Sequence, residues 1–144
     1  MRYLCIDLGD KRTGLAVGDA ETRLVSALSV LESPIAVRGG EALLEALAKA
    51  VDEQLGKSAG ELVVGLPLNM DDTEGPRAKS VRAFAARIGE RIGRVVHFQD
   101  ERLTSAAADW SMARSGMTRG EKKQRRDAIA AAEILRDFLA GLPS

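Results

Sequence analysis

The chain opens with the apolar run Tyr3-Leu-Cys-Ile-Asp-Leu8, which the turn Gly9-Asp-Lys-Arg12 separates from a second run over Thr13 to Val17. Two such runs joined by a short turn that contains glycine predict a β-hairpin. A third apolar run, from Arg23 to Val30, continues the pattern. We therefore expect the chain to begin with three short strands that form an antiparallel meander.

Beyond residue 40 the apolar spacing changes from that of strands to a mixture of helices and strands. The predicted helices are Leu43–Leu55, Pro76–Ile92, Thr104–Ser115 and Asp127–Leu139, and the predicted strands are Leu62–Leu66 and Val95–Phe98. Three meander strands followed by helix–strand units indicate an α/β fold, with a mixed five-stranded sheet flanked by helices. Since 144 residues fit one domain of ordinary size, we expect a single domain over residues 1–144.

Composition narrows the class of protein. Lys plus Arg and Asp plus Glu are both 21, so attraction to a polyanion would have to come from local clusters. No apolar run approaches the roughly 20 residues that span a bilayer. Cys5 is the only cysteine, which suits a reducing compartment. We expect a soluble, cytoplasmic protein.

Three acids lie where the fold alone gives little reason for them. Asp7 interrupts an apolar strand, although burial of a lone carboxylate is costly. Glu101 follows a predicted strand, where the ligand sites of parallel sheets lie. Asp127 extends the apolar stripe of the last predicted helix, at its amino end. Each acid also has a purely structural interpretation. Asp7 fits a buried ion-pair partner, Glu101 a solvated loop residue, and Asp127 a helix cap or first-turn residue.

If the three acids converge, they offer oxygen ligands for two divalent ions about 3.5–4 Å apart. A zinc site of nitrogen and sulfur ligands is disfavoured, because His97 and Cys5 are the only residues of their kinds. Both are read as packed strand residues.

Basic residues lie near the acids along the chain. Residues 119–126 contain five cations and one acid, a local net charge of +4, and lead directly into Asp127. Such clusters bind phosphate backbones, although a charge run is more often a solvated surface. The candidate nucleic-acid contacts are Lys11, Arg12, Arg102, Lys122, Lys123, Arg125 and Arg126. Gly9 and Gly14 indicate either a tight hairpin or a backbone that approaches phosphate.

Four blocks of the chain resemble the YqgF (RuvX) family, in order and at compatible spacing. The blocks are Asp7-Leu-Gly-Asp-Lys-Arg-Thr-Gly-Leu-Ala-Val-Gly-Asp19, Gly65-Leu-Pro-Leu-Asn-Met-Asp-Asp-Thr-Glu-Gly75, Asp100-Glu-Arg-Leu-Thr-Ser105 and the terminal helix with Asp127, Ala130-Ala131 and Ile134-Leu135. One visible departure is Asp72, which stands where the family usually has glycine. That departure concerns the conformation or the contacts of the second block.

The resemblance implies an RNase H-like fold and an acidic triad of Asp7, Glu101 and Asp127 that binds Mg²⁺ or Mn²⁺. Family members were first proposed to resolve Holliday junctions and are described as nucleases that mature the 5′ end of pre-16S ribosomal RNA. A metal-dependent nuclease is therefore expected, with nucleic acid as partner and pre-ribosomal particles as a further one. RNA is favoured as substrate and a DNA junction stays open. The sequence does not predict an oligomeric state.

Two other functions fit parts of the sequence. Sugar-kinase and actin-like phosphate binders share the fold and open with a similar Asp-x-Gly hairpin, but they need a duplicated domain to enclose a nucleotide. A non-catalytic protein that binds RNA or the ribosome would need the basic patches without three converging acids. Loss of metal binding in Asp7→Asn, with RNA affinity kept, would favour the nuclease.

Overall fold

The computed structural model describes residues 1–101 and 119–143, and only the backbone of residues 119–125. The strands are β1 (Arg2–Asp7), β2 (Thr13–Asp19), β3 (Val25–Leu31), β4 (Glu61–Leu66) and β5 (Val96–Asp100). The helices are η1 (Val37–Gly40), α1 (Glu41–Leu55), α2 (Pro76–Ile92) and α4 (Arg119–Ala140). The predicted helix over residues 104–115 lies outside the described residues.

All five strands form one mixed sheet in the order β3-β2-β1-β4-β5. β1 pairs with β2, and β2 with β3, in antiparallel fashion, which confirms the predicted meander. β4 pairs in parallel with β1 on one side and with β5 on the other. The three parallel strands therefore end at the same edge of the sheet, and their ends carry Asp7, Leu66 and Asp100.

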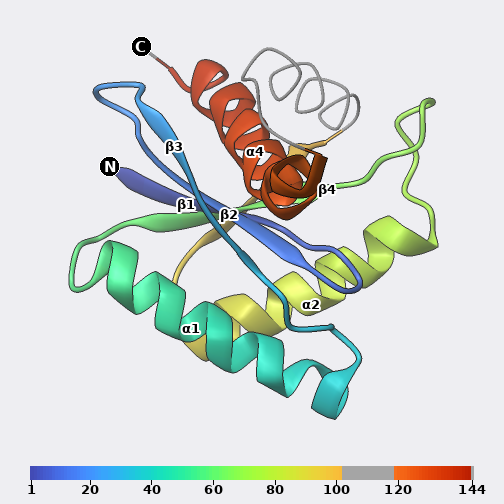
Figure 1. Cartoon of the computed structure of the whole chain (residues 1–144). Helices are drawn as coiled ribbons and strands as arrows, with labels where there is room; N and C mark the ends of the chain where they lie inside the picture. Colours follow the sequence, from blue (N-terminus) through green and yellow to red (C-terminus); the bar gives the residue numbers. More distant parts are fainter. Residues whose placement is uncertain (102–118, 144) are drawn as a thin grey trace.

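Helices cover both faces of the sheet, and each face has its own apolar core. Figure 1 shows α1 and α2 on one face and α4 on the other. The first core packs α1 and α2 against side chains such as Leu4, Ile6 and Leu15. The second packs α4 against the residues that alternate with these, such as Cys5 and Ala16. Because strand side chains alternate between faces, Asp7 shares the α4 face with Cys5.

The ends of α1 and α2 follow the signals in the sequence. Pro76 occupies the first turn of α2, where its missing N–H costs no helical hydrogen bond. Gly93 ends α2 in the left-handed conformation, with φ 74°, and Gly56 ends α1. None of the helices in the described ranges is both long and apolar enough to cross a bilayer.

The start of α4 differs from the prediction. The helix begins at Arg119, whereas the apolar pattern placed its start at Asp127 and left the basic residues before it in a loop. Glu, Lys, Gln and Arg are strong helix formers, but they form no apolar stripe that would show where the helix begins. Asp127 is therefore an interior helix residue, and its reading as a cap or first-turn acid is wrong.

Candidate active site

The site is built where β1 and β5 end beneath α4. The register pairs Asp7 with Gly14 of β2 and Ile6 with Val64 of β4, so Gly65 lies beside Asp7. Glu101 directly follows β5, and its backbone N–H donates to the carbonyl of Leu66 at 3.2 Å. The structure thus brings Glu101, predicted as a strand-exit residue, to the same edge as Asp7.

Asp7 and Glu101 form a hydrogen-bonded carboxyl pair. Burial, the charge and hydrogen bond of Glu101 and the charge of Asp127 raise the pKa of Asp7 to about 8. Burial also raises the pKa of Glu101, although the hydrogen bond from Asp7 opposes that effect. These directions describe a protonated Asp7 that donates to an ionised Glu101, because two buried like charges cannot both be tolerated at close range.

Gly65 makes room for Glu101. A Cβ atom at Gly65 would lie 2.5 Å from Oε2 of Glu101 and 2.8 Å from Cδ1 of Ile134. Both distances are far below van der Waals contact, so only glycine fits without displacing the carboxylate. The sequence showed Gly65 as part of a motif but gave no reason for it.

Asp127 is held over β2 by its backbone. A Cβ atom at Gly14 would lie 1.9 Å from the carbonyl oxygen of Asp127 and 2.8 Å from the amide nitrogen of Ala128. α4 therefore rests directly on the strand. The glycine at position 14 serves this close approach, a reason that neither reading of the hairpin motif included.

The carboxylate of Asp127 contacts Arg12, whose Nε donates to Oδ2 at 3.3 Å. Both side chains are partly exposed, at 38% for Arg12 and 31% for Asp127. Arg12 is the last residue of a tight turn, in which a Cβ atom at Gly9 would lie 2.3 Å from the carbonyl oxygen of Arg12. The turn after β1 thus places the guanidinium of Arg12 beside the carboxylate of Asp127.

Arg77 is a second cation at the site, and it was not among the residues predicted from the sequence. From the first turn of α2, its Nη2 donates to the carbonyl of Leu8 at 2.9 Å, and its Nη1 contacts Asp10 at 2.5 Å. Its charge lowers the pKa of both Asp7 and Glu101. Because these contacts join residues more than 60 positions apart, no local pattern could reveal them.

The other basic candidates are placed only in part. Lys11 is exposed in the turn after β1, and Arg126 is exposed on α4 next to Asp127. The backbones of Lys122, Lys123 and Arg125 belong to α4. Arg102 lies outside the described residues.

The donor set suits a hard divalent cation only in part. Mg²⁺ and Mn²⁺ prefer carboxylate oxygens, and a buried pair that shares a proton can exchange the proton for a metal ion. Within residues 1–101 and 119–143, however, no three His, Cys, Asp or Glu side chains are grouped so that they could hold an ion. Asp7 and Glu101 fit as ligands, whereas the carboxylate of Asp127 is paired with Arg12.

The loop between β4 and α2 is closed by its own hydrogen bonds. The N–H of Asn69 donates to the carbonyl of Thr73 at 2.9 Å, and the N–H of Asp72 donates to the carbonyl of Asn69 at 2.9 Å. Asp72 has φ 68°, a left-handed conformation that glycine adopts most easily and aspartate tolerates. This geometry gives a physical reason for glycine at this place in the family motif.

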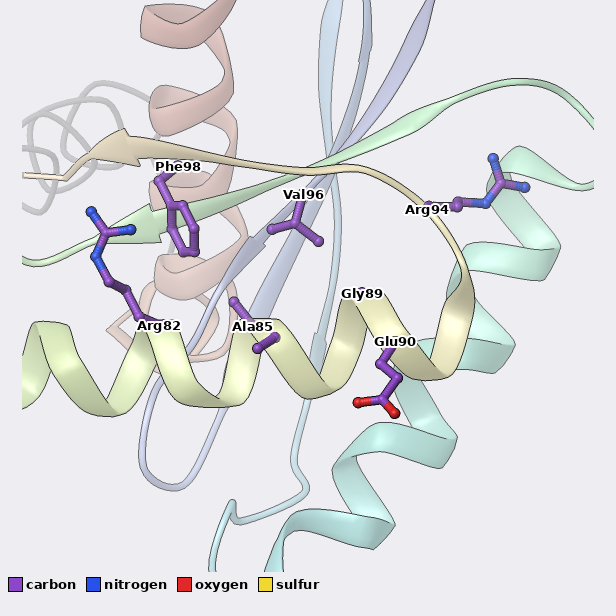
Figure 2. Close-up of a pocket in the computed structure, with 8 residues that line it drawn as sticks. Arg82, Ala85, Gly89, Glu90, Arg94, Val96 and Phe98 are labelled. Atoms are coloured by element: carbon purple, nitrogen blue, oxygen red, sulfur yellow. The ribbon is translucent and has the colours of Figure 1, made fainter.

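An apolar pocket of about 350 Å³ lies between α2 and β5, on the other face of the sheet. Figure 2 shows Val96 and Phe98 pointing from β5 toward α2, with Arg82 beside the ring of Phe98. The guanidinium of Arg82 lies 4.7 Å from that ring and donates to Glu74 at 2.6 Å. This contact ties the loop before α2 to β5 and includes no acid of the site.

His97 and Cys5 both face the second core. Cys5 is fully buried, and burial with the charges of Asp7 and Glu101 raises the pKa of its thiol well above the ordinary value. His97 contacts Glu61 at 2.8 Å and packs against Tyr3 and Phe138. Their reading as packed strand residues agrees with these contacts.

Comparison with known proteins places the chain in a family. A family model described as "RuvX: Holliday junction resolvase" matches residues 1–141. A protein of Anaeromyxobacter sp. (strain Fw109-5) named "Putative pre-16S rRNA nuclease" is 41% identical over 141 residues, which cover 98% of both chains. A protein of the same name from Streptococcus sanguinis (strain SK36) is 36% identical over 140 residues, covering 96% of this chain and 97% of that one.

The solved structure of Thermus thermophilus RuvC has a TM-score of 0.55 over 98% of this chain and 97% of that one, at 15% identity. At that identity the likeness concerns the fold, and it confirms the RNase H-like fold expected from the sequence. The family match covers all four blocks of the resemblance and includes Asp7, Glu101 and Asp127. The chain therefore belongs to the RuvX family.

Proposed function

We propose that residues 1–144 form one nuclease domain that hydrolyses phosphodiester bonds of ribosomal RNA precursors, at the site of Asp7, Glu101 and Asp127. The observation that carries this proposal is the buried, proton-sharing pair of Asp7 and Glu101 beneath α4. Such a pair costs folding free energy, and perturbed carboxyl groups of this kind gather at functional sites. The relatives named for pre-16S ribosomal RNA supply the substrate class.

Each residue has a role in this proposal. Asp7, Glu101 and Asp127 would hold one or two Mg²⁺ or Mn²⁺ ions, with Asp7 between the other two acids. When bound, such ions lower the pKa of a water nucleophile and stabilise the leaving oxygen. Gly65 keeps Glu101 against Asp7, and Gly14 keeps Asp127 over β2. Arg77 fixes the turn after β1 and lowers the proton affinity of the acid pair.

The cations around the acids would hold the phosphate backbone. Lys11, Arg12 and Arg126 flank the site on two different elements, β1–β2 and α4. The backbones of Lys122, Lys123 and Arg125 precede Arg126 in α4, and we include these residues in the proposal. Arg102 follows Glu101 and belongs to the same proposal. Such contacts set the position of a strand without reading its sequence. We place the activity in the cytoplasm, on RNA within pre-ribosomal particles.

Cleavage of matched substrates tests the proposal and separates RNA from DNA junctions. The substrates are an RNA with the precursor 5′ end of 16S ribosomal RNA, an unrelated single-stranded RNA and a four-way DNA junction, each with Mg²⁺ or Mn²⁺. We expect the wild type to cut the precursor RNA and Glu101→Gln to lose that activity. Cutting of the junction alone would assign the same site to the resolvase reaction in the family's description. Binding without any metal-dependent cutting would assign the chain to RNA binding.

A further inference from the structure

Of the three acids proposed to bind metal, Asp127 is the one whose carboxylate is paired with an arginine, Arg12. Asp7 and Glu101 already contact each other, whereas Asp127 directs Oδ2 to Nε of Arg12 at 3.3 Å. A carboxylate oxygen that accepts from a guanidinium cannot at the same time bind a divalent cation without bringing two positive charges together. Arg12 and a metal ion therefore compete for Asp127.

The backbone leaves Asp127 little other freedom. Its carbonyl oxygen lies against Gly14, which is paired with Asp7 across the two strands. α4 cannot slide along the sheet without losing this close contact, so the position of the Asp127 carboxylate changes mainly by side-chain rotation. Release of Arg12 is then the local event that lets Asp127 turn toward Asp7.

Arg12 is held weakly enough for a phosphate to take it. The contact to Asp127 runs through Nε, and both side chains are about a third exposed. Breaking a partly exposed pair of this kind changes an equilibrium about fivefold or less. A phosphodiester can instead accept two parallel N–H groups of the same guanidinium, which is the stronger arrangement.

We propose that Arg12 is a switch between substrate and metal: it closes on Asp127 in the free protein, and a substrate phosphate draws it away so that Asp127 can join the metal site. Nucleic acid and divalent metal then favour each other's binding, because coupling between two ligands is reciprocal. This inference rests on the proposed role of the three acids as metal ligands.

The first test measures Mn²⁺ binding to the RNA-free protein, from the electron paramagnetic resonance signal of free Mn²⁺. Arg12→Gln removes the competitor and should tighten Mn²⁺ binding about fivefold, the factor for breaking a partly exposed ion pair. Lys11→Gln removes the same charge from the adjacent, exposed residue and should tighten it less than about twofold, since exposed charges are screened. Equal affinity of Arg12→Gln and the wild type would overturn the switch.

The second test measures binding of a fluorescent 12-nucleotide single-stranded RNA in EDTA, where no metal contributes. Asp127→Asn should tighten RNA binding, because it frees Arg12. In the Arg12→Gln background the same change should have a smaller effect, and in the Lys11→Gln background it should keep its full effect. An equal gain in all three backgrounds would mean that Asp127 acts only through its charge, and the switch would be wrong.

The same Mn²⁺ titrations separate this inference from the proposed function. If Asp7→Asn and Asp127→Asn bind Mn²⁺ as the wild type does, the acids are not metal ligands and the proposed function fails. If those variants lose Mn²⁺ while Arg12→Gln gains nothing, the metal site stands and only the switch fails.

Discussion

Among the glycines in the described part of the chain, Gly65 is the one at which an added methyl group would meet a site carboxylate. Because its Cβ would lie 2.5 Å from Oε2 of Glu101, Gly65→Ala should push Glu101 away from Asp7. We expect a loss of about 1–3 kcal/mol in unfolding free energy from overpacking, together with weaker Mn²⁺ binding. Gly141→Ala is the matched control, since its Cβ meets atoms only at 3.6 Å and beyond. Wild-type Mn²⁺ affinity in Gly65→Ala would contradict this account of Glu101.

The proton on Asp7 makes metal-free stability depend on pH. Its pKa is about 8 in the folded protein and near 3.8 when exposed, so the folded state binds more protons between these values. Stability from this group is complete at low pH and is lost as pH rises through 8. Other acids, such as Glu41, have lowered pKa values and act in the opposite direction, but below about pH 5.

Denaturant unfolding in EDTA from pH 5 to 9 should therefore show a falling stability that Asp7→Asn flattens. Metal binding should also tighten over the same window, because the ion must displace the shared proton. If the two proteins have the same slope, Asp7 does not hold the proton.

The candidate site residues that could be predicted from the sequence are those whose chemistry conflicts with their surroundings. Asp7 stood out because it interrupts an apolar strand, and Asp127 because it extends an apolar helical stripe. Gly65 and Arg77 act through contacts with residues far away in the chain, so their roles needed the structure. The Arg12 contact with Asp127, across 115 positions, is of the same kind.

Among the elements, the position of α4 depends on the close packing of its backbone against β2. Gly14→Ala would place a methyl group 1.9 Å from the Asp127 carbonyl oxygen, and backbone atoms cannot rotate away. Gly18 lies on the same face of β2, but its Cβ would meet the ends of the Leu135 and Val25 side chains at 3.0 Å and the Leu24 carbonyl oxygen at 3.1 Å, all much farther away than the Asp127 oxygen at Gly14. We expect Gly14→Ala to lose about 3 kcal/mol or more and Gly18→Ala clearly less, measured by urea unfolding. Equal losses of unfolding free energy in the two variants would show that the backbone contact at Gly14 does not fix the position of α4.

The loop before α2 offers a test of backbone conformation. Asp72→Gly and Asp72→Ala both remove the side chain and its contacts, so their difference isolates the cost of φ 68°. Glycine should be the more stable by about 1 kcal/mol, because alanine is strained in the left-handed region. Denaturant midpoints of the two variants compare them directly, and a more stable Asp72→Ala would show that the loop changes its conformation.

Helices and strands in which apolar residues recur at regular spacing were predictable, and segments without such spacing were not. Leu43, Leu47 and Val51 placed α1 correctly, and Pro76 with Gly93 fixed both ends of α2. The first two turns of α4 contain mostly charged residues, so no apolar stripe marked them. The order of the strands in the sheet was not predicted, because a meander followed by two crossovers still leaves more than one arrangement.

In the whole molecule, the acid site opposes folding in the absence of metal. Burial of Asp7 beside Glu101 and Asp127 is unfavourable, so Asp7→Asn should leave metal-free stability equal or higher. An acid that served to neutralise a buried cation would behave otherwise, since removing one partner of a buried pair costs about 3–5 kcal/mol. Unfolding free energies in EDTA at pH 8 distinguish the two cases. A loss of that size would identify Asp7 as a structural acid.

Our main proposal is that Asp7, Glu101 and Asp127 form a metal-dependent hydrolytic site. Its most direct test is the single-turnover rate of RNA cleavage with saturating Mn²⁺, for the wild type and a folded Asp7→Asn protein. We expect the rate to fall on the order of a hundredfold or more in Asp7→Asn, because several kcal/mol of transition-state stabilisation depend on the ion. Cleavage by Asp7→Asn at the wild-type rate would contradict it.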